Sequence, residues 1–223
     1  MEIKQFGERA LIIQFENIIS EEVHQKVKAY YQYLSNRHLE GITSLIPAYT
    51  SITIQFDDDL INFSSLSEII QSIDIHKKEN QPLQRIVEIP VCYDTTLGLD
   101  LEEVSQQLDV SIDEIIELHT SNLYTVYMLG FSPGFMYLGG LDPRLFIPRK
   151  STPRLKIPAG AVGLADQQTG IYPQATPGGW QIIGQTPLSI FEVNQPPKVK
   201  MGDKVKFEII DLSTFQQLNQ NNV

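Results

Sequence analysis

The sequence predicts an α+β protein in which a small mixed α/β part is followed by a β-barrel. Within residues 1–82, strand-like alternation and helix-like periodicity follow one another. A polar segment at 76–85 then interrupts both patterns and is typical of a linker. Beyond Leu123, short apolar stretches are separated by glycine and proline turns, which indicates a closed or nearly closed barrel. We therefore predict two domains, residues 1–82 and 83–223.

The first domain is predicted to be a ferredoxin-like sandwich. Ser20 is a good N-cap because two acidic residues follow it in the first helical turn. The order strand, helix, two strands, helix is that of a split βαβ unit. The predicted elements are a strand at 10–15, a helix from 21 to about 34, strands at 42–46 and 51–56, and a helix at 64–75.

The second domain is predicted to begin with an edge strand at 86–93, because Pro90 lacks the amide that a central strand needs. Asp100 and Ser111 each precede a glutamate by three residues, which is the spacing of a capping box, so two short helices are expected before His119. Further strands are predicted at 124–129 and 204–210, type II turns at Pro133-Gly134 and Pro177-Gly178, and a frayed tail at 216–223.

Composition limits the classes of function. The formal net charge of −10 argues against binding to nucleic acid or to an anionic membrane surface. Cys92 is the single cysteine, so no internal disulfide can form. No apolar run approaches the roughly 20 residues that a membrane helix needs, and the N-terminus does not resemble a secretory signal. These features predict a cytoplasmic protein.

Common catalytic motifs do not account for the sequence. Neither a P-loop nor a Rossmann fingerprint is present, and no motif predicts a metal site. Gly130-Phe-Ser132-Pro-Gly134 matches the nucleophile elbow, but Gly139-Gly140 prevents the helix that must follow, and all four histidines precede Ser132. We interpret this match as a coincidence of a turn.

The stretch from Gly130 to Pro187 differs from the rest of the chain. It contains ten of the fourteen glycines, eight of the thirteen prolines and the only tryptophan, Trp180. It also carries five basic residues against two acidic ones, within an acidic protein. A basic, aromatic and turn-rich surface of this kind suits a small anion.

Three arginines in this stretch are candidates for anion binding. Arg144, Arg149 and Arg154 each directly follow a proline, and a preordered backbone lowers the entropy cost of presenting a guanidinium group to a carboxylate or phosphate. Surface ion pairs explain any single one of them equally well. His119 is more often a helix-end residue than a catalyst in such a position. Tyr137, Tyr172 and Trp180 fit either core packing or a pocket wall.

Five motifs occur in one order with close spacing. They are His119-Thr-Ser-x-x-Tyr-x-Val126, Gly130-Phe-x-Pro-Gly-Phe-x-Tyr-Leu138, Pro153-Arg-x-x-x-Pro-x-Gly160, Gly170-Ile-Tyr-Pro173 and Pro177-Gly-Gly-Trp-x-Ile-x-Gly-x-Thr-Pro187. Together they resemble the family of the 5-oxoprolinase B subunit, also called allophanate hydrolase subunit 1 or the KipI family. The chain is similar, too, to subdomains C and D of the carboxyltransferase domain of urea carboxylase. One departure is Gln185, where the family pattern has a basic residue.

The resemblance implies an N-terminal α/β domain and a cyclophilin-like barrel. It implies one component of ATP-dependent 5-oxoprolinase, inactive alone, which acts with the KipA-like C subunit and with the A subunit to convert 5-oxoproline to glutamate. The expected catalytic residues are His119 and Arg154. The expected substrate-binding residues are Arg144, Arg149, Tyr137, Tyr172, Pro133, Gly134, Gly178 and Trp180, with no metal. Two alternatives stay open: a KipI-like inhibitor that binds a sensor histidine kinase and, by fold analogy only, a prolyl isomerase.

Overall fold

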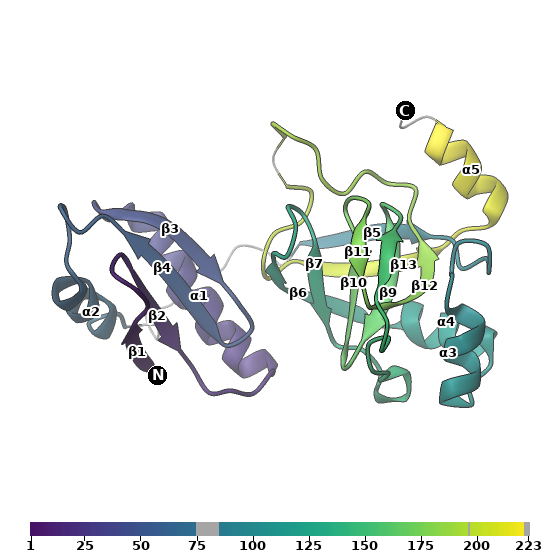
Figure 1. Cartoon of the computed structure of the whole chain (residues 1–223), viewed down its shortest axis with the longest axis horizontal. Coiled ribbons are helices and arrows are strands. Elements are labelled where there is room, and N and C mark those ends of the chain that lie inside the picture. Colours follow the sequence, from purple (N-terminus) through teal and green to yellow (C-terminus); the bar gives the residue numbers. More distant parts are fainter. Residues whose placement is uncertain (75–84, 196, 221–223) are drawn as a thin grey trace. The chain divides into compact units, whose positions relative to one another are not determined.

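The computed structural model describes residues 1–74, 85–195 and 197–220 (Figure 1). The chain divides into two compact units, residues 1–83 and 84–223. The predicted domain boundary between residues 82 and 83 falls within 75–84 and lies outside the described residues, as does most of the predicted linker at 76–85.

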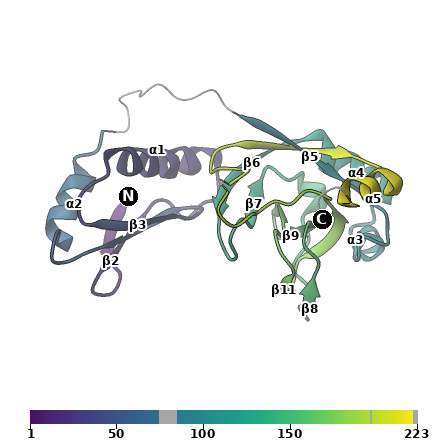
Figure 2. The ribbon, with the colours of Figure 1, turned by 90° about the horizontal axis from the view of Figure 1, so that it is seen from above.

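The first unit is a four-stranded antiparallel sheet in the order β1-β2-β4-β3, with α1 packed against one face (Figure 2). Its elements are β1 (Glu2–Gln5), β2 (Ala10–Gln14), α1 (Glu21–Arg37), β3 (Ile42–Pro47), β4 (Ser51–Phe56) and α2 (Phe63–Gln71). Ser20 caps α1 as predicted, since its side chain accepts a hydrogen bond from the Val23 amide.

The order β2-β4-β3 with its connecting helix is the core of the predicted ferredoxin-like unit. The edge beside β2 is filled by β1, which was not predicted because most of its residues are exposed and give no apolar alternation. The second helix ends at Gln71, earlier than the predicted Ile75, because the Ser72 hydroxyl and amide bond to carbonyls of its last turn.

The second unit contains a seven-stranded sheet in the order β12-β9-β10-β7-β6-β13-β5, and a separate pair, β11-β8. The large sheet is formed by β5 (Ile86–Val91), β6 (Leu123–Leu129), β7 (Met136–Gly139), β9 (Ala161–Ala165), β10 (Gln168–Ile171), β12 (Gln181–Gln185) and β13 (Lys204–Ile209). The pair consists of β8 (Arg154–Ile157) and β11 (Thr176–Gly178). Figure 2 shows this pair projecting from the large sheet.

The large sheet curls until its two edges meet. β5 is an edge strand, as Pro90 predicts, and Cys92 just beyond it exchanges both backbone hydrogen bonds with Gln185 of β12, at 2.9 and 3.0 Å. Gly184 permits this approach, because a Cβ atom there would lie 2.8 Å from the Cys92 carbonyl oxygen. The two backbone bonds close the barrel that the turn-rich sequence predicts.

In the described residues of the second unit, the barrel is accompanied by the helical segments α3 (Leu101–Leu108), α4 (Ile112–Ser121), the 3₁₀ turn η1 (Pro143–Leu145) and α5 (Leu212–Gln220). Ser111 caps α4 as predicted, but the side chain of Asp100 makes no capping bond to α3. The predicted frayed tail is wrong for residues 216–220, because Asp211 accepts a bond from the Thr214 amide and starts α5. Residues 221–223 lie outside the described part.

The two predicted Pro-Gly turns have different outcomes. The turn at Pro133-Gly134 is confirmed by a φ of 84° at Gly134 and by a 3.0 Å bond from the Phe135 amide to the Ser132 carbonyl. The turn at Pro177-Gly178 is wrong, since both residues belong to β11. In the described ranges, no helix combines the length and apolar character needed to span a bilayer.

Candidate functional site

A pocket of about 270 Å³ opens beside the β8-β11 pair of the second unit. Its walls come from the loop before β7, β7 itself, the loop before β8, the residue that follows β10, and β11 with the residues that follow it. The lining residues are Phe131, Phe135, Tyr137, Arg149, Pro153, Tyr172, Pro177, Gly178, Gly179 and Trp180. The structure thus brings together five of the ten residues predicted for the site: Tyr137, Arg149, Tyr172, Gly178 and Trp180.

The floor of the pocket is a cluster of aromatic rings centred on Phe135. Its ring centroid lies 4.7 Å from that of Tyr137, 4.9 Å from Tyr172 and 5.3 Å from Trp180, the last two edge to face. This geometry is favourable for aromatic pairs and holds each ring in one orientation. Phe135 and Tyr172 are each 1% exposed, so the cluster is a closely packed apolar base, and the more exposed rings of Phe131 and Tyr137 offer apolar surface to a small ring.

Glycines of the sheet make room for the tryptophan. A Cβ atom at Gly170 of β10 would lie 2.8 Å from the Trp180 indole, and one at Gly163 of β9 would lie 3.1 Å from the Trp180 Cβ. The glycine-rich sequence of these strands is therefore explained by close packing as well as by turns.

Arg149 supplies the charge of the pocket. Its guanidinium carbon lies 6.0 Å from the centroid of the Trp180 ring, and its Nε lies 3.6 Å from the exposed Asp166 carboxylate. Burial raises the pKa of Tyr137, although the nearby Arg149 charge opposes it, and burial raises the pKa of Tyr172 to about 12. Both phenols are neutral at pH 7, so the lining carries one positive charge and suits an anion.

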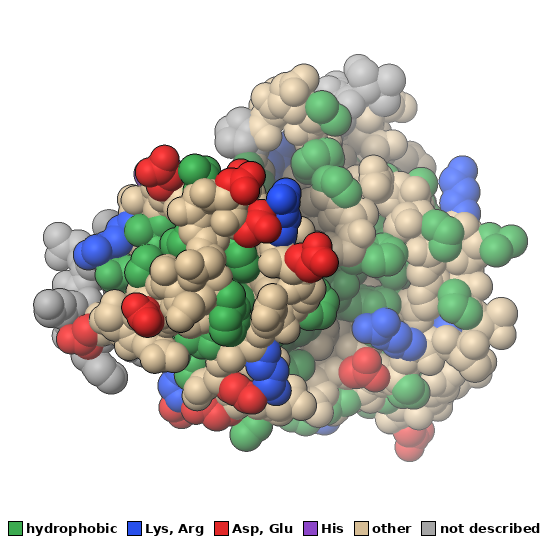
Figure 3. Space-filling model, turned by 60° about the vertical axis from the view of Figure 1, so that its left-hand side comes forward, with side chains coloured by type: hydrophobic (Ala, Val, Ile, Leu, Met, Phe, Trp, Pro, Cys, Tyr) green, Lys and Arg blue, Asp and Glu red, His purple; other side chains and the backbone are tan. Residues whose placement is uncertain are grey.

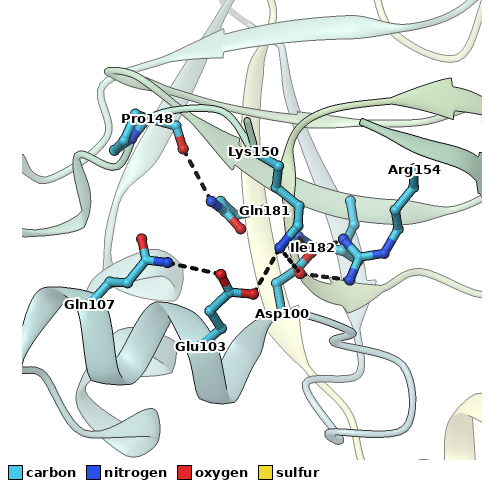
Figure 4. Close-up of polar contacts among 8 residues, drawn as sticks. All are labelled: Asp100, Glu103, Gln107, Pro148, Lys150, Arg154, Gln181 and Ile182. Carbon is cyan, nitrogen blue, oxygen red and sulfur yellow. Dashed lines mark hydrogen bonds and ion pairs between the residues drawn. The ribbon is translucent and has the colours of Figure 1, made fainter. Parts of the chain in front are cut away.

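Arg154 and Arg144 are placed away from this lining. The Arg154 guanidinium makes a two-pronged pair with the buried Asp100 carboxylate, with distances of 2.6 and 2.7 Å (Figure 4). Arg144 is 58% exposed and pairs with Asp142 and Glu114 around η1. The prediction that Arg154 is catalytic is not supported by this position, since its hydrogen-bonding edge is occupied by Asp100.

His119 lies in the barrel core and not at the pocket. It is fully buried, with Nδ1 2.7 Å from the Tyr93 hydroxyl and Nε2 2.8 Å from the Thr169 hydroxyl. Its ring stacks on Phe207 with centroids 4.5 Å apart. Burial lowers the pKa of His119 to about 3, so the ring is neutral. This position does not support the predicted proton-donor role, because both nitrogens are occupied by protein hydroxyls.

We expect His119 to make the second unit acid-sensitive. Its folded pKa lies below the unfolded value near 6.5, so the unfolded state takes up the proton first and stability falls as the pH falls below about 6.5. The loss between pH 7 and pH 5 should be about 2 kcal/mol. Urea unfolding followed by the fluorescence of Trp180 measures this unit, and the pH slope should flatten in His119→Gln. An equal slope in both proteins would contradict the assignment.

The remaining predicted residues lie close to the pocket without lining it. Pro133 and Gly134 form the turn between Phe131 and Phe135, and Gly134 packs on Phe191. Gln185 donates to the Ala159 carbonyl at 2.6 Å beside the barrel closure. A basic side chain at this position is therefore not needed to charge the pocket, which already contains Arg149.

Several residues of the site were not predicted from the sequence. Phe131, Phe135 and Pro153 line the pocket, and their motif positions were the only available signal. Asp100 was interpreted as a helix cap, although its carboxylate receives Lys150, Arg154 and the Ile182 amide. These partners are 50 to 82 positions away in the chain, so no local pattern could reveal them.

Gly178 leaves no room for a side chain. A Cβ atom there would lie 2.5 Å from the Tyr172 hydroxyl and 2.8 Å from the Ile157 Cδ1. Gly178→Ala should displace the buried Tyr172 ring and lower the stability by about 1–3 kcal/mol. Urea unfolding tests this expectation. Gly179→Ala is the matched control, because a Cβ atom at position 179 would lie 3.6 Å from its nearest neighbour, the Lys150 carbonyl oxygen. Equal stability of the two variants would contradict it.

Comparison with known proteins supports the family resemblance. Residues 1–201 match the family model described as carboxyltransferase domain, subdomain C and D. The chain is 43% identical over 220 residues to the 5-oxoprolinase B subunit of Bacillus subtilis (strain 168), a match covering 92% of this chain and 91% of the relative.

Solved structures agree. In the crystal structure of TTHA0988, the matching region is 34% identical in sequence and superposes with a TM-score of 0.82. The match covers 91% of this chain and 40% of TTHA0988, so this chain spans about 40% of the length of that protein. The urea amidolyase of K. lactis matches with a TM-score of 0.80 over 99% of this chain and 15% of its own, at 18% identity, which shows the fold alone. The predicted α+β fold with a cyclophilin-like barrel is confirmed. The chain belongs to the family of the 5-oxoprolinase B subunit, whose module is the carboxyltransferase domain, subdomain C and D.

Proposed function

We propose that this chain is the B subunit of an ATP-dependent 5-oxoprolinase and that the aromatic pocket binds 5-oxoproline. The name of the relatives supports the proposed enzyme activity. One observation supports the proposed binding site, namely that Arg149 is the charged group in a pocket lined by aromatic rings. 5-Oxoproline is a five-membered lactam with a carboxylate. Its ring would pack on the Phe135 cluster while its carboxylate pairs with the Arg149 guanidinium.

The reaction needs more than this pocket contains. Amide resonance makes the lactam unreactive, so phosphorylation of the lactam oxygen by ATP would create a leaving group and an electrophilic carbon for water. The balanced reaction is 5-oxoproline, ATP and two water molecules to glutamate, ADP and phosphate, since one water is consumed in opening the ring and the other in releasing the phosphoryl group as phosphate. The described lining includes no carboxylate and no histidine that could move a proton. We assign to this chain the binding and orientation of the substrate, and phosphoryl transfer to its partner proteins.

A multi-component enzyme fits the relatives. Their name, which designates a B subunit, implies other components, which we propose are the KipA-like C subunit and the A subunit. The match to TTHA0988 covers only 40% of that protein, so a homologous unit occurs there within a longer chain. This chain alone is then expected to be inactive, with ATP as a substrate of the assembled complex.

The distribution of charged side chains on one face agrees with a role in binding a small molecule. Basic side chains on the face shown in Figure 3 are scattered among acidic and apolar ones. Such a surface does not form the basic track that nucleic acid requires. The cytoplasmic location stays a prediction from the sequence.

Reconstitution with the A and C subunits tests the function. The complex should hydrolyse ATP only when 5-oxoproline is present and should release glutamate in equal amounts. Omission of this chain should abolish the coupled reaction. A complex that hydrolyses ATP equally well with and without 5-oxoproline would overturn the proposal. The kinase-inhibitor alternative would instead be favoured by recovery of a sensor kinase bound to this chain, and no relative described above points to it.

A further inference from the structure

Asp100 lies at the centre of a buried ionic cluster outside the pocket. Its carboxylate is fully buried and accepts four hydrogen bonds, two from Arg154, one from Lys150 at 2.8 Å and one from the Ile182 amide at 2.7 Å (Figure 4). Glu103 pairs with Lys150 at 2.8 Å. The cluster therefore has two cations and two anions and is neutral as a whole.

The two cations lie at the ends of the segment 150–154, which directly follows the pocket arginine. Lys150 directly follows Arg149, and Arg154 begins β8 four residues later. Figure 4 shows both side chains pointing at the Asp100 carboxylate, which lies at the start of α3. One carboxylate thus fixes both ends of the segment from Arg149 to Arg154, which includes the lining residue Pro153.

The same loop is fastened along its backbone to the residues around the pocket tryptophan. The Lys150 amide donates to the Gly179 carbonyl at 2.7 Å, and the Gln181 side chain donates to the Pro148 carbonyl at 3.2 Å. These bonds flank Arg149 in one loop and Trp180 in the connection between β11 and β12. The hydrogen bond from the Ile182 amide to Asp100 lies next to these two bonds along the chain and links the same segment to the start of α3.

We infer that Asp100 is a positioning residue that holds Arg149 beside Trp180, so that the Arg149 guanidinium, whose one ion pair is the exposed contact with Asp166, faces the pocket while Lys150 and Arg154 are held by Asp100. Asp100 touches neither the pocket nor the substrate. The inference rests on the proposed function only for the identity of the bound anion. The placement of the loop is independent of it.

Trp180 gives a measurement that needs no ligand, because it is the only tryptophan in the chain and is 4% exposed. In Asp100→Asn, which keeps the shape and removes the charge, we expect acrylamide quenching of Trp180 to rise at least about twofold as the loop loosens. Lys150→Met removes one cation of the cluster and should raise the quenching by a smaller amount. This variant replaces Asp100→Asn in the experiment if Asp100→Asn does not fold.

Two controls separate positioning from general destabilisation. Tyr93→Phe removes a buried hydroxyl that contacts His119 in the core, away from the loop. Glu208→Gln removes an exposed ion pair with Lys206. Quenching should match that of the unmodified chain in both. If Asp100→Asn and Lys150→Met also match it, the positioning role is overturned, whatever the complex does with 5-oxoproline.

The assembled complex gives the functional readout. Asp100→Asn should raise KM for 5-oxoproline by about tenfold while kcat changes by less than about twofold, because binding is lost and the reacting groups are untouched. Raised quenching with an unchanged KM would support the positioning role and overturn the assignment of the pocket to 5-oxoproline. Unchanged quenching with an intact KM would overturn the positioning role and leave the pocket assignment standing.

Discussion

Arg149→Ala should lower the affinity of the complex for 5-oxoproline by about ten- to a hundredfold, because a charged hydrogen bond to a carboxylate contributes about 1.5–3 kcal/mol. The loss should appear mainly in KM, since the guanidinium binds the carboxylate and not the reacting amide. Stability should change little, because Arg149 is 59% exposed and its Asp166 partner lies 3.6 Å away. Steady-state kinetics of the reconstituted complex measures both constants.

Arg144→Ala is the matched control for this prediction. Arg144 also follows a proline in the same basic stretch, but its ion pairs are with Asp142 and Glu114 outside the pocket. It should keep KM within about twofold of the unmodified complex. Equal effects of the two substitutions would show that general positive charge, and not the pocket arginine, binds the substrate.

Asp100→Ala should lower the free energy of unfolding of the second unit by about 3 kcal/mol, because it leaves Lys150 and Arg154 largely buried without their shared anion. Urea unfolding followed by Trp180 fluorescence measures the loss. Glu103→Ala is the control, since Glu103 is half exposed and contacts only one of the two cations. A loss below about 1 kcal/mol in Asp100→Ala would mean that the cluster contributes little.

The same carboxylate predicts a pH dependence at the acid end. Burial raises the pKa of Asp100, but hydrogen bonds from Arg154, Lys150 and the Ile182 amide outweigh it and hold the pKa below its usual value. A lowered folded pKa means that the stabilisation is present above the unfolded pKa near 3.9 and is lost as the pH falls through the folded pKa. In Asp100→Ala, the free energy of unfolding should therefore depend less on pH below about pH 4 than it does in the unmodified chain.

Local patterns were enough to predict most of the fold. Ser20 and Ser111 determine where helices begin through bonds to residues three positions away, and Pro90 marks an edge strand by its missing amide. β1 was missed because an exposed edge strand carries no apolar alternation. The turn predicted at Pro177 was wrong because pairing with β8, a tertiary contact, keeps that segment extended.

The site was only partly predictable, for a physical reason. Of three arginines that each follow a proline, the sequence could not tell which would pair with a buried carboxylate and which would face the pocket. That choice depends on Asp100, which is 54 positions from Arg154 and contacts it only in the folded barrel. His119 was selected by its motif, yet its two hydroxyl partners come from Tyr93 and from Thr169 of another strand. Composition indicated the stretch that lines the pocket, and tertiary contacts determine which of its residues face that pocket.

The proposed function depends above all on the pairing of the Arg149 guanidinium with the substrate carboxylate. The most direct measurement compares binding of 5-oxoproline and of 2-pyrrolidone, the same lactam without the carboxylate, to the complex with and without Arg149→Ala. We predict that the unmodified complex prefers 5-oxoproline by at least about tenfold and that the substitution removes most of this preference. A preference that is unchanged in Arg149→Ala would contradict this pairing.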